Sequence, residues 1–155
     1  MLLEGKPAPE LAVMNQHKKQ VRLQDFKGKW LVIYFYPKDF TPGCTVEGCE
    51  FTALYPEFQK RNAEVVGVSP DSIESHVKFA QGHKIEFTLL ADTESKVCKA
   101  YSVWGQKQSG DKHFMGINRT TFIIGLDKTV KAVFRDVKPV GHAQEVLEKL
   151  KELQF

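Results

Sequence analysis

The feature that most constrains the fold is an unbroken apolar run, Trp30 to Tyr36, followed within five residues by a strong helix start. Such a run is typical of a central strand that is buried on both faces of an α/β protein. Thr41 is a good N-cap, and Pro42 stands where proline is favoured, at the first helical position. The segment therefore predicts a strand, a short loop and a helix. Other elements of the chain must pack against both faces of the strand.

The rest of the chain continues this alternation. Further strands are expected at residues 11–14, 21–23, 64–69, 87–91, 120–124 and 130–134, and further helices at residues 72–81, 95–101 and 143–153. Residues 105–116 are polar and are expected to form a loop. The order of elements predicts an α/β protein with a thioredoxin-like fold, in which helices flank a mixed central sheet. No repeat or long linker divides the chain, so residues 1–155 are expected to form a single domain.

Composition and charge exclude several classes of protein. The 155 residues are 42% hydrophobic and 26% charged, which is ordinary for a globular chain. The net charge of +3 is too small and too dispersed to indicate a nucleic-acid partner. No apolar run approaches the roughly 20 residues that span a bilayer, and residues 1–9 do not resemble a signal peptide. We therefore expect a cytoplasmic protein without a membrane partner.

The cysteines point to redox chemistry. There are three of them, which is too few and an odd number for a secreted disulfide framework. Cys44 falls at the third position of the predicted helix, near unpaired N–H groups and the positive end of the helix dipole. That environment favours the thiolate, which is the nucleophilic form of cysteine. A buried, inert Cys44 remains an alternative on these residues alone, but Cys49 lies only five positions further on.

The spacing of Pro37, Thr41 and Cys44 resembles the active-site pattern of the peroxiredoxins. The longer segment from Asp39 to Thr45, together with Cys49, resembles the peroxiredoxin Q branch, also called bacterioferritin comigratory protein. The likeness extends along nearly the whole chain, through residues 5–9, 66–69, 90–92, 100–105 and 115–122. The last of these segments is similar to the one that supplies the family's active-site arginine, here Arg119.

The resemblance implies a thiol peroxidase that reduces hydrogen peroxide and organic hydroperoxides. Cys44 would attack the peroxide, and Thr41 would orient the substrate and hydrogen-bond the sulfur. Arg119 would hold the thiolate and stabilise the charge that develops as the O–O bond breaks, while Pro37 would pack over the site. Cys49 would resolve the resulting sulfenic acid by forming a disulfide. Thioredoxin or a similar dithiol would recycle the enzyme, which needs no cofactor or metal and is expected to be a monomer or weak dimer.

Other residues carry weaker expectations. Cys98 is expected to be a structural thiol, with a resolving or mixed-disulfide role as the alternative. Glu47 is expected at the surface or in a local ion pair. The histidines form no motif and are expected at the surface; they are His17, His76, His83, His113 and His142. The spacing of the cysteines fits no zinc pattern.

Two other functions remain open. A thiol–disulfide oxidoreductase of the thioredoxin type normally has two residues between its cysteines, whereas four separate Cys44 from Cys49. A redox sensor or chaperone-like module on the same fold is the other alternative.

The predicted helix is too extended for a disulfide between Cys44 and Cys49. On an intact helix the Cα atoms of these two residues would lie about 8–9 Å apart. A disulfide needs roughly 4.4–6.8 Å, so oxidation is expected to unwind the first turns of this helix.

Overall fold

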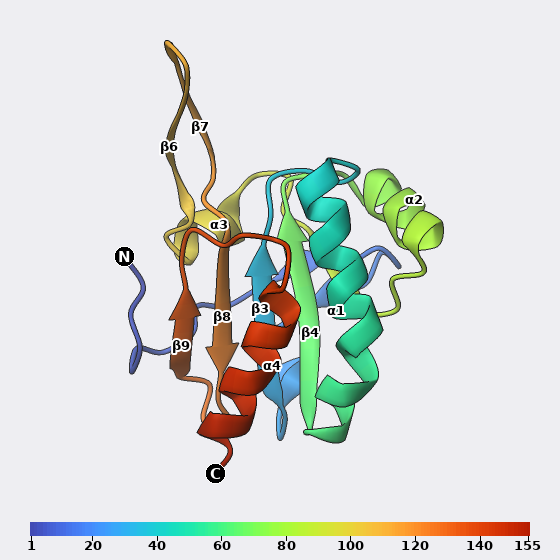
Figure 1. The fold of residues 1–155 in the computed structure, drawn as a ribbon, viewed down its shortest axis with the longest axis vertical. Coiled ribbons are helices and arrows are strands. Elements are labelled where there is room, and N and C mark those ends of the chain that lie inside the picture. Colours follow the sequence, from blue (N-terminus) through green and yellow to red (C-terminus); the bar gives the residue numbers. More distant parts are fainter.

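A mixed five-stranded sheet forms the centre of the computed structural model, which describes residues 1–108 and 110–155 (Figure 1). The strands lie in the order β5-β4-β3-β8-β9. Their bounds are β3 (Trp30–Phe35), β4 (Ala63–Ser69), β5 (Thr88–Ala91), β8 (Thr120–Ile124) and β9 (Val130–Phe134). β3, β4 and β5 run parallel, whereas β8 is antiparallel to both β3 and β9. The predicted mixed sheet is confirmed, with the apolar run at its middle strand.

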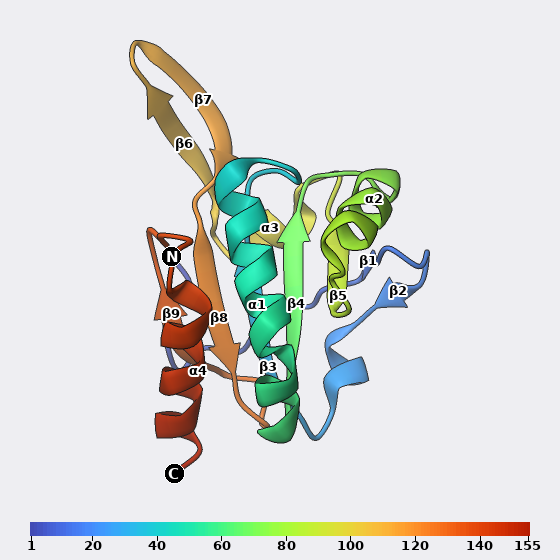
Figure 2. The same ribbon diagram turned by 45° about the vertical axis from the view of Figure 1, so that its right-hand side comes forward.

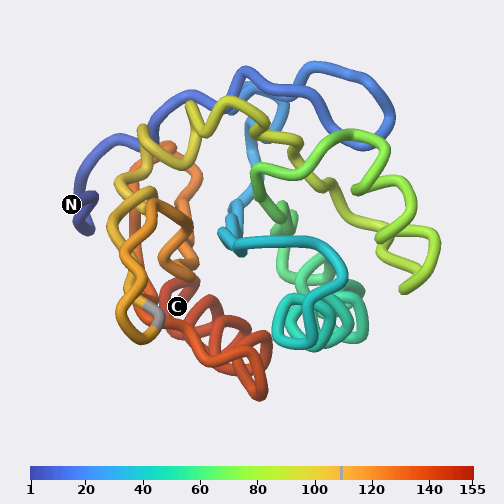
Figure 3. Tube along the Cα trace, turned by 90° about the horizontal axis from the view of Figure 1, so that it is seen from above, coloured from blue at the N-terminus to red at the C-terminus, as the bar shows by residue number. Residues whose placement is uncertain are grey.

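Helices cover both faces of this sheet, as Figure 3 shows from above. One face packs against α1 (Pro42–Lys60), α2 (Ile73–His83) and α4 (His142–Leu153). The other packs against α3 (Lys96–Ala100), the 3₁₀ helix η1 (Leu23–Phe26) and the N-terminal segment with β1 (Val13–Met14) and β2 (Gln20–Val21). Because successive side chains of a strand point to opposite faces, Val32 and Tyr34 enter the first core and Leu31 and Ile33 the second. The thioredoxin-like architecture is confirmed.

One expected loop is instead a β-hairpin. β6 (Trp104–Ser109) and β7 (Lys112–Ile117) pair antiparallel and form a separate two-stranded sheet. Figures 1 and 2 show that this hairpin projects beyond the body of the molecule. A projecting hairpin needs few apolar side chains, and Phe114 and Met115 are about half exposed. The segment therefore lacks the alternation by which half-buried strands are recognised in a sequence.

The register of β3 and β8 brings two distant segments together. Phe35, the last residue of β3, pairs with Thr120, the first residue of β8. Residue 119 consequently lies at the end of the sheet where β3 passes into the loop that leads to α1. Among the described residues, no helix is long and apolar enough to cross a membrane.

Candidate active site

Cys44 lies at the amino end of α1, where a negative charge is favoured. Thr41 is the N-cap, with an extended backbone, and Pro42 opens the helix, so Cys44 is the third helical residue. Its side chain is buried, with 1% of its surface exposed. The first N–H groups of an α-helix have no acceptor within the helix, and the helix dipole places partial positive charge there. A sulfur anion at this position is therefore stabilised by the backbone itself.

Arg119, the residue directly before β8, contacts this sulfur with its side chain. Its Nη2 donates to Cys44 Sγ at 2.8 Å, across 75 positions of sequence, and its Nη1 donates to Glu47 Oε1 at 2.9 Å. The Val137 N–H donates to the Arg119 carbonyl and anchors the backbone from which the side chain extends. A Cβ on Gly43 would lie only 3.0 Å from Arg119 Nη2, so glycine at this position allows the close approach. The proximity of Arg119 and Cys44 that the sequence resemblance implied is therefore present.

Glu47 is buried and forms an ion pair, so of the two environments expected for it the surface is wrong. It lies one helical turn after Cys44 and faces the same side, with 1% of its surface exposed. Its ion pair joins it to Arg119 rather than to a neighbour in sequence. Burial raises the pKa of Glu47 from 4.5 to about 7, although the positive charge of Arg119 acts in the opposite direction. Its second oxygen, Oε2, has no hydrogen-bond partner among the described residues.

Thr41 and Pro37 lie in the loop between β3 and α1. The Thr41 hydroxyl donates to the Lys38 carbonyl at 2.8 Å. The described contacts include no hydrogen bond between that hydroxyl and Cys44, but its oxygen keeps lone pairs that can accept one. Pro37 lies two residues after the end of β3 and is half-buried. The roles assigned to both residues by the resemblance stay predictions.

The other two cysteines have contrasting environments. Cys49 is exposed, and its Sγ lies 3.8 Å from Nδ1 of His83. Cys98 is fully buried on α3, in the core of the sheet face opposite to Cys44. Burial, assisted by a hydrogen bond to Asp92, raises the pKa of Cys98 well above its usual range. This burial is the environment expected of a structural thiol.

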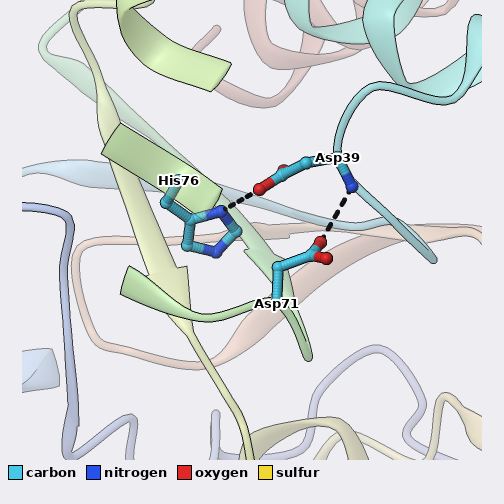
Figure 4. Close-up of side chains that lie close together, drawn as sticks. All are labelled: Asp39, Asp71 and His76. Carbon is cyan, nitrogen blue, oxygen red and sulfur yellow. Dashed lines mark hydrogen bonds and ion pairs between the residues drawn. The ribbon is translucent and has the colours of Figure 1, made fainter. Parts of the chain in front are cut away.

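A buried hydrogen-bond network supports the loop before Cys44. Asp39 Oδ2 lies 2.7 Å from His76 Nδ1, and the Asp39 N–H donates to Asp71 Oδ2 at 2.8 Å (Figure 4). The Tyr36 hydroxyl donates to Asp39 Oδ1 at 2.7 Å, and the Ser75 hydroxyl donates to Oδ2 at 2.8 Å. Carboxylate and imidazole groups gathered in this way can in principle ligate a metal. Here, however, these ligand atoms are hydrogen-bonded to one another and to neighbouring hydroxyls. The cluster therefore stabilises the loop that precedes Cys44.

Sequence reasoning missed two buried histidines and one contact. His76 is fully buried in the network just described, and His142 is 2% exposed, with Nε2 2.7 Å from the Thr121 hydroxyl. Both were expected at the surface, and that expectation is wrong. His83 was expected there too, and its contact with Cys49 joins the end of α2 to the third turn of α1. The only signal in the sequence for these positions was the helical spacing of His76, Phe79 and His83. Such spacing shows that the residues share one face of a helix, but not which residues pack against that face.

Fold and site together define a class: a cysteine-based redox enzyme of thioredoxin-like fold, with its nucleophile at a helix start beside an arginine. Residues 5–133 match the AhpC/TSA family. Peroxiredoxin Bcp of Bacillus subtilis is 44% identical over 149 residues, which are 96% of this chain and 95% of the relative. Peroxiredoxin Bcp of Escherichia coli K12 is 40% identical over 151 residues, 97% of each chain.

Solved structures agree with these relatives. The bacterioferritin comigratory protein of Xanthomonas campestris, studied for its alkyl peroxide reduction activity, is 41% identical with a TM-score of 0.89, over 94% of this chain and 92% of that one. A mutant of the Xylella fastidiosa peroxiredoxin Q is 38% identical with a TM-score of 0.92, over 100% and 99% of the two chains. The chain belongs to the AhpC/TSA family, as a thiol peroxidase of the peroxiredoxin Q type.

Proposed function

We propose that Cys44 is the peroxidatic cysteine, that Cys49 resolves its sulfenic acid, and that a thioredoxin-like dithiol recycles the disulfide. The observation that carries the proposal is the 2.8 Å contact of Arg119 Nη2 with the buried Cys44 Sγ at the start of α1. A fixed cation beside a nucleophilic sulfur at a helix start suits the attack of a thiolate on an O–O bond.

In the first step, the Cys44 thiolate attacks one oxygen of the hydroperoxide. The S–O bond forms as the O–O bond breaks, so that sulfur is oxidised to a sulfenic acid and the departing alkoxide or hydroxide takes a proton. Negative charge moves from sulfur to the departing oxygen. The Arg119 guanidinium and the free N–H groups of the first helical turn stabilise that charge. The Thr41 hydroxyl orients the peroxide, and Pro37 limits the access of water.

In the second step, the Cys49 thiolate attacks the Cys44 sulfur. The S–S bond forms as the S–O bond breaks, and the departing hydroxide takes a proton to become water. Cys44 and Cys49 are five positions apart on an intact helix, which sets their Cα atoms about 8–9 Å apart. A disulfide requires less than roughly 7 Å, so the first turns of α1 open during each cycle. Opening also presents the disulfide to its reductant.

The remaining properties follow from this chemistry. A thiol reductant of the thioredoxin type suits a disulfide between two cysteines that the opening of α1 makes accessible. We infer a cytoplasmic location, because closely spaced reactive cysteines are typical of reducing compartments. A monomer or weak dimer is the expected assembly, and residues 1–155 are expected to act as one domain.

Steady-state consumption of hydrogen peroxide and cumene hydroperoxide, with thioredoxin and its reductase, tests the proposal. Cys44→Ser should abolish turnover with both peroxides, because a neutral hydroxyl cannot replace a thiolate. Cys49→Ser should abolish thioredoxin-dependent turnover while a single oxidation of Cys44 survives. Cys98→Ala is the matched control and should retain the rate. Turnover by Cys44→Ser, or reduction of protein disulfides at a rate above that of peroxide, would reject the proposal.

A further inference from the structure

The resolving cysteine has a histidine beside its sulfur. Cys49 Sγ and His83 Nδ1 are 3.8 Å apart, within reach of a sulfur hydrogen bond. Cys49 belongs to the third turn of α1, and His83 is the last residue of α2. A nucleophile with a base at this distance is the arrangement by which enzymes activate cysteine, and such contacts tighten during reaction.

Two aromatic rings orient the imidazole. Phe79 lies one turn earlier on α2, with its ring edge-on to His83 at a centroid distance of 5.3 Å. Phe40 lies 6.1 Å from His83 and packs edge-on against Phe79 at 5.2 Å. Phe40 holds this place with a φ of +66°, a left-handed conformation that is unusual for an aromatic residue. Of the contacts described for the imidazole, Cys49 is the only titratable one.

The helix that carries His83 is firmly attached to the body of the protein. His76 Nε2 lies 2.9 Å from the Leu90 carbonyl of β5, and its Nδ1 binds Asp39, as Figure 4 shows. Because a carbonyl oxygen only accepts, Nε2 carries a hydrogen. Phe79 is fully buried in the core beneath α2. These contacts fix α2 and His83 while the start of α1 opens.

Opening need not carry Cys49 away from His83. Unwinding residues 42–48 frees Cys44 to move, whereas Phe51, fully buried, holds the following turn of α1 in the core. Cys49 then stands at the start of the shortened helix, where the dipole favours a thiolate. His83 and the new helix start act on the same sulfur.

We propose that His83 is a catalytic base for the resolving step, and this rests on the proposed role of Cys49. His83 Nδ1 takes the proton of the Cys49 thiol, and the thiolate attacks the Cys44 sulfenic sulfur. The S–S bond forms, the S–O bond breaks, and the departing hydroxide takes a proton to become water. The sulfenic acid produced by the peroxide is the oxidant, and the imidazolium returns its proton to solvent.

The test separates the two chemical steps. Reduced protein is mixed with one equivalent of hydrogen peroxide and quenched at intervals, and sulfenic acid, disulfide and thiol are counted by intact mass after trapping. In the variant His83→Gln, the amide side chain is planar and polar like imidazole, but it cannot accept the proton of the Cys49 thiol. We expect the first oxidation to be unchanged and disulfide formation to slow by about a hundredfold, in the range of general-base catalysis. His113→Gln, on the exposed β6–β7 hairpin, is the matched control and should behave as the unaltered protein.

A pH profile distinguishes a base from a packing role. Raising the pH ionises thiols without help, so the rate deficit of His83→Gln should shrink steadily between pH 6.5 and pH 9.5. A constant deficit, a wild-type resolving rate or faster resolution would each overturn the assignment of His83. If Cys49→Ser blocks the disulfide while His83→Gln has no effect, only this inference fails. If Cys49→Ser still forms an intramolecular disulfide, the resolving role of Cys49 fails and the inference falls with it.

Discussion

Replacing Glu47 by glutamine should stabilise the fold at pH 8 and much less at pH 5. The folded protein holds the pKa of Glu47 at about 7, compared with 4.5 for an exposed glutamate, because the carboxyl is buried. Each pKa unit is worth about 1.4 kcal/mol, so the ionised carboxylate costs roughly 3 kcal/mol of folding free energy at pH 8. A raised carboxyl pKa means that stability is full below pH 4.5 and is lost as the pH rises through 7.

The penalty is therefore pH-dependent in a measurable way. At pH 5 it has fallen to about 1 kcal/mol, which leaves a difference of roughly 2 kcal/mol between the two pH values. Urea unfolding of Glu47→Gln and its parent at pH 5 and pH 8 isolates this difference, because contributions that do not depend on pH cancel. Both proteins carry Cys44→Ser, so that no thiolate titrates beside Arg119. Glu57→Gln, an exposed position of α1, serves as the control and should change stability by only a few tenths of a kcal/mol at either pH.

An equal effect of Glu47→Gln at both pH values would refute the reasoning, since it would mean that the buried carboxyl carries no ionisation penalty. The protein tolerates this cost because the carboxylate holds Nη1 of Arg119 and so directs Nη2 toward Cys44. With Cys44 intact, Glu47→Gln should therefore be more stable at pH 8 and slower in peroxide reduction.

Three further outcomes are expected. Arg119→Ala should lower the rate constant of the first oxidation about a hundredfold or more, measured by stopped flow, because a preorganised donor is lost; an unchanged rate would exclude the electrostatic role. Cys49→Ser should make Cys44 easier to over-oxidise to sulfinic acid, read by mass spectrometry at rising peroxide concentration; equal resistance would point to another resolving thiol. Amide exchange at residues 41–48 should be faster in the disulfide form than in the reduced form; protection in both would show that α1 closes the bond without opening.

Much of the fold can be predicted because its signals are local. The apolar run 30–36 identifies a doubly buried strand, and Thr41 with Pro42 identifies the helix start that places Cys44 at its third position. These signals depend on the residues themselves and on periodicity over a few turns. The resemblance to the peroxiredoxins added Arg119, which no local pattern distinguishes from a surface charge. The β6–β7 hairpin escaped prediction because it stands outside the core and carries no alternating apolar pattern.

The chemistry around Cys44 was decided by tertiary structure. The register of β3 and β8 places Arg119 beside the start of α1, where its guanidinium forms an ion pair with the buried Glu47. The packing of α2 on α1 likewise decides that His83 stands at Cys49. Helical spacing shows which side chains share a face, but not which residue from a distant element meets them. By itself, therefore, the sequence determined the elements of the core and the nucleophile, whereas long-range packing decided the partners that set the charge of that nucleophile.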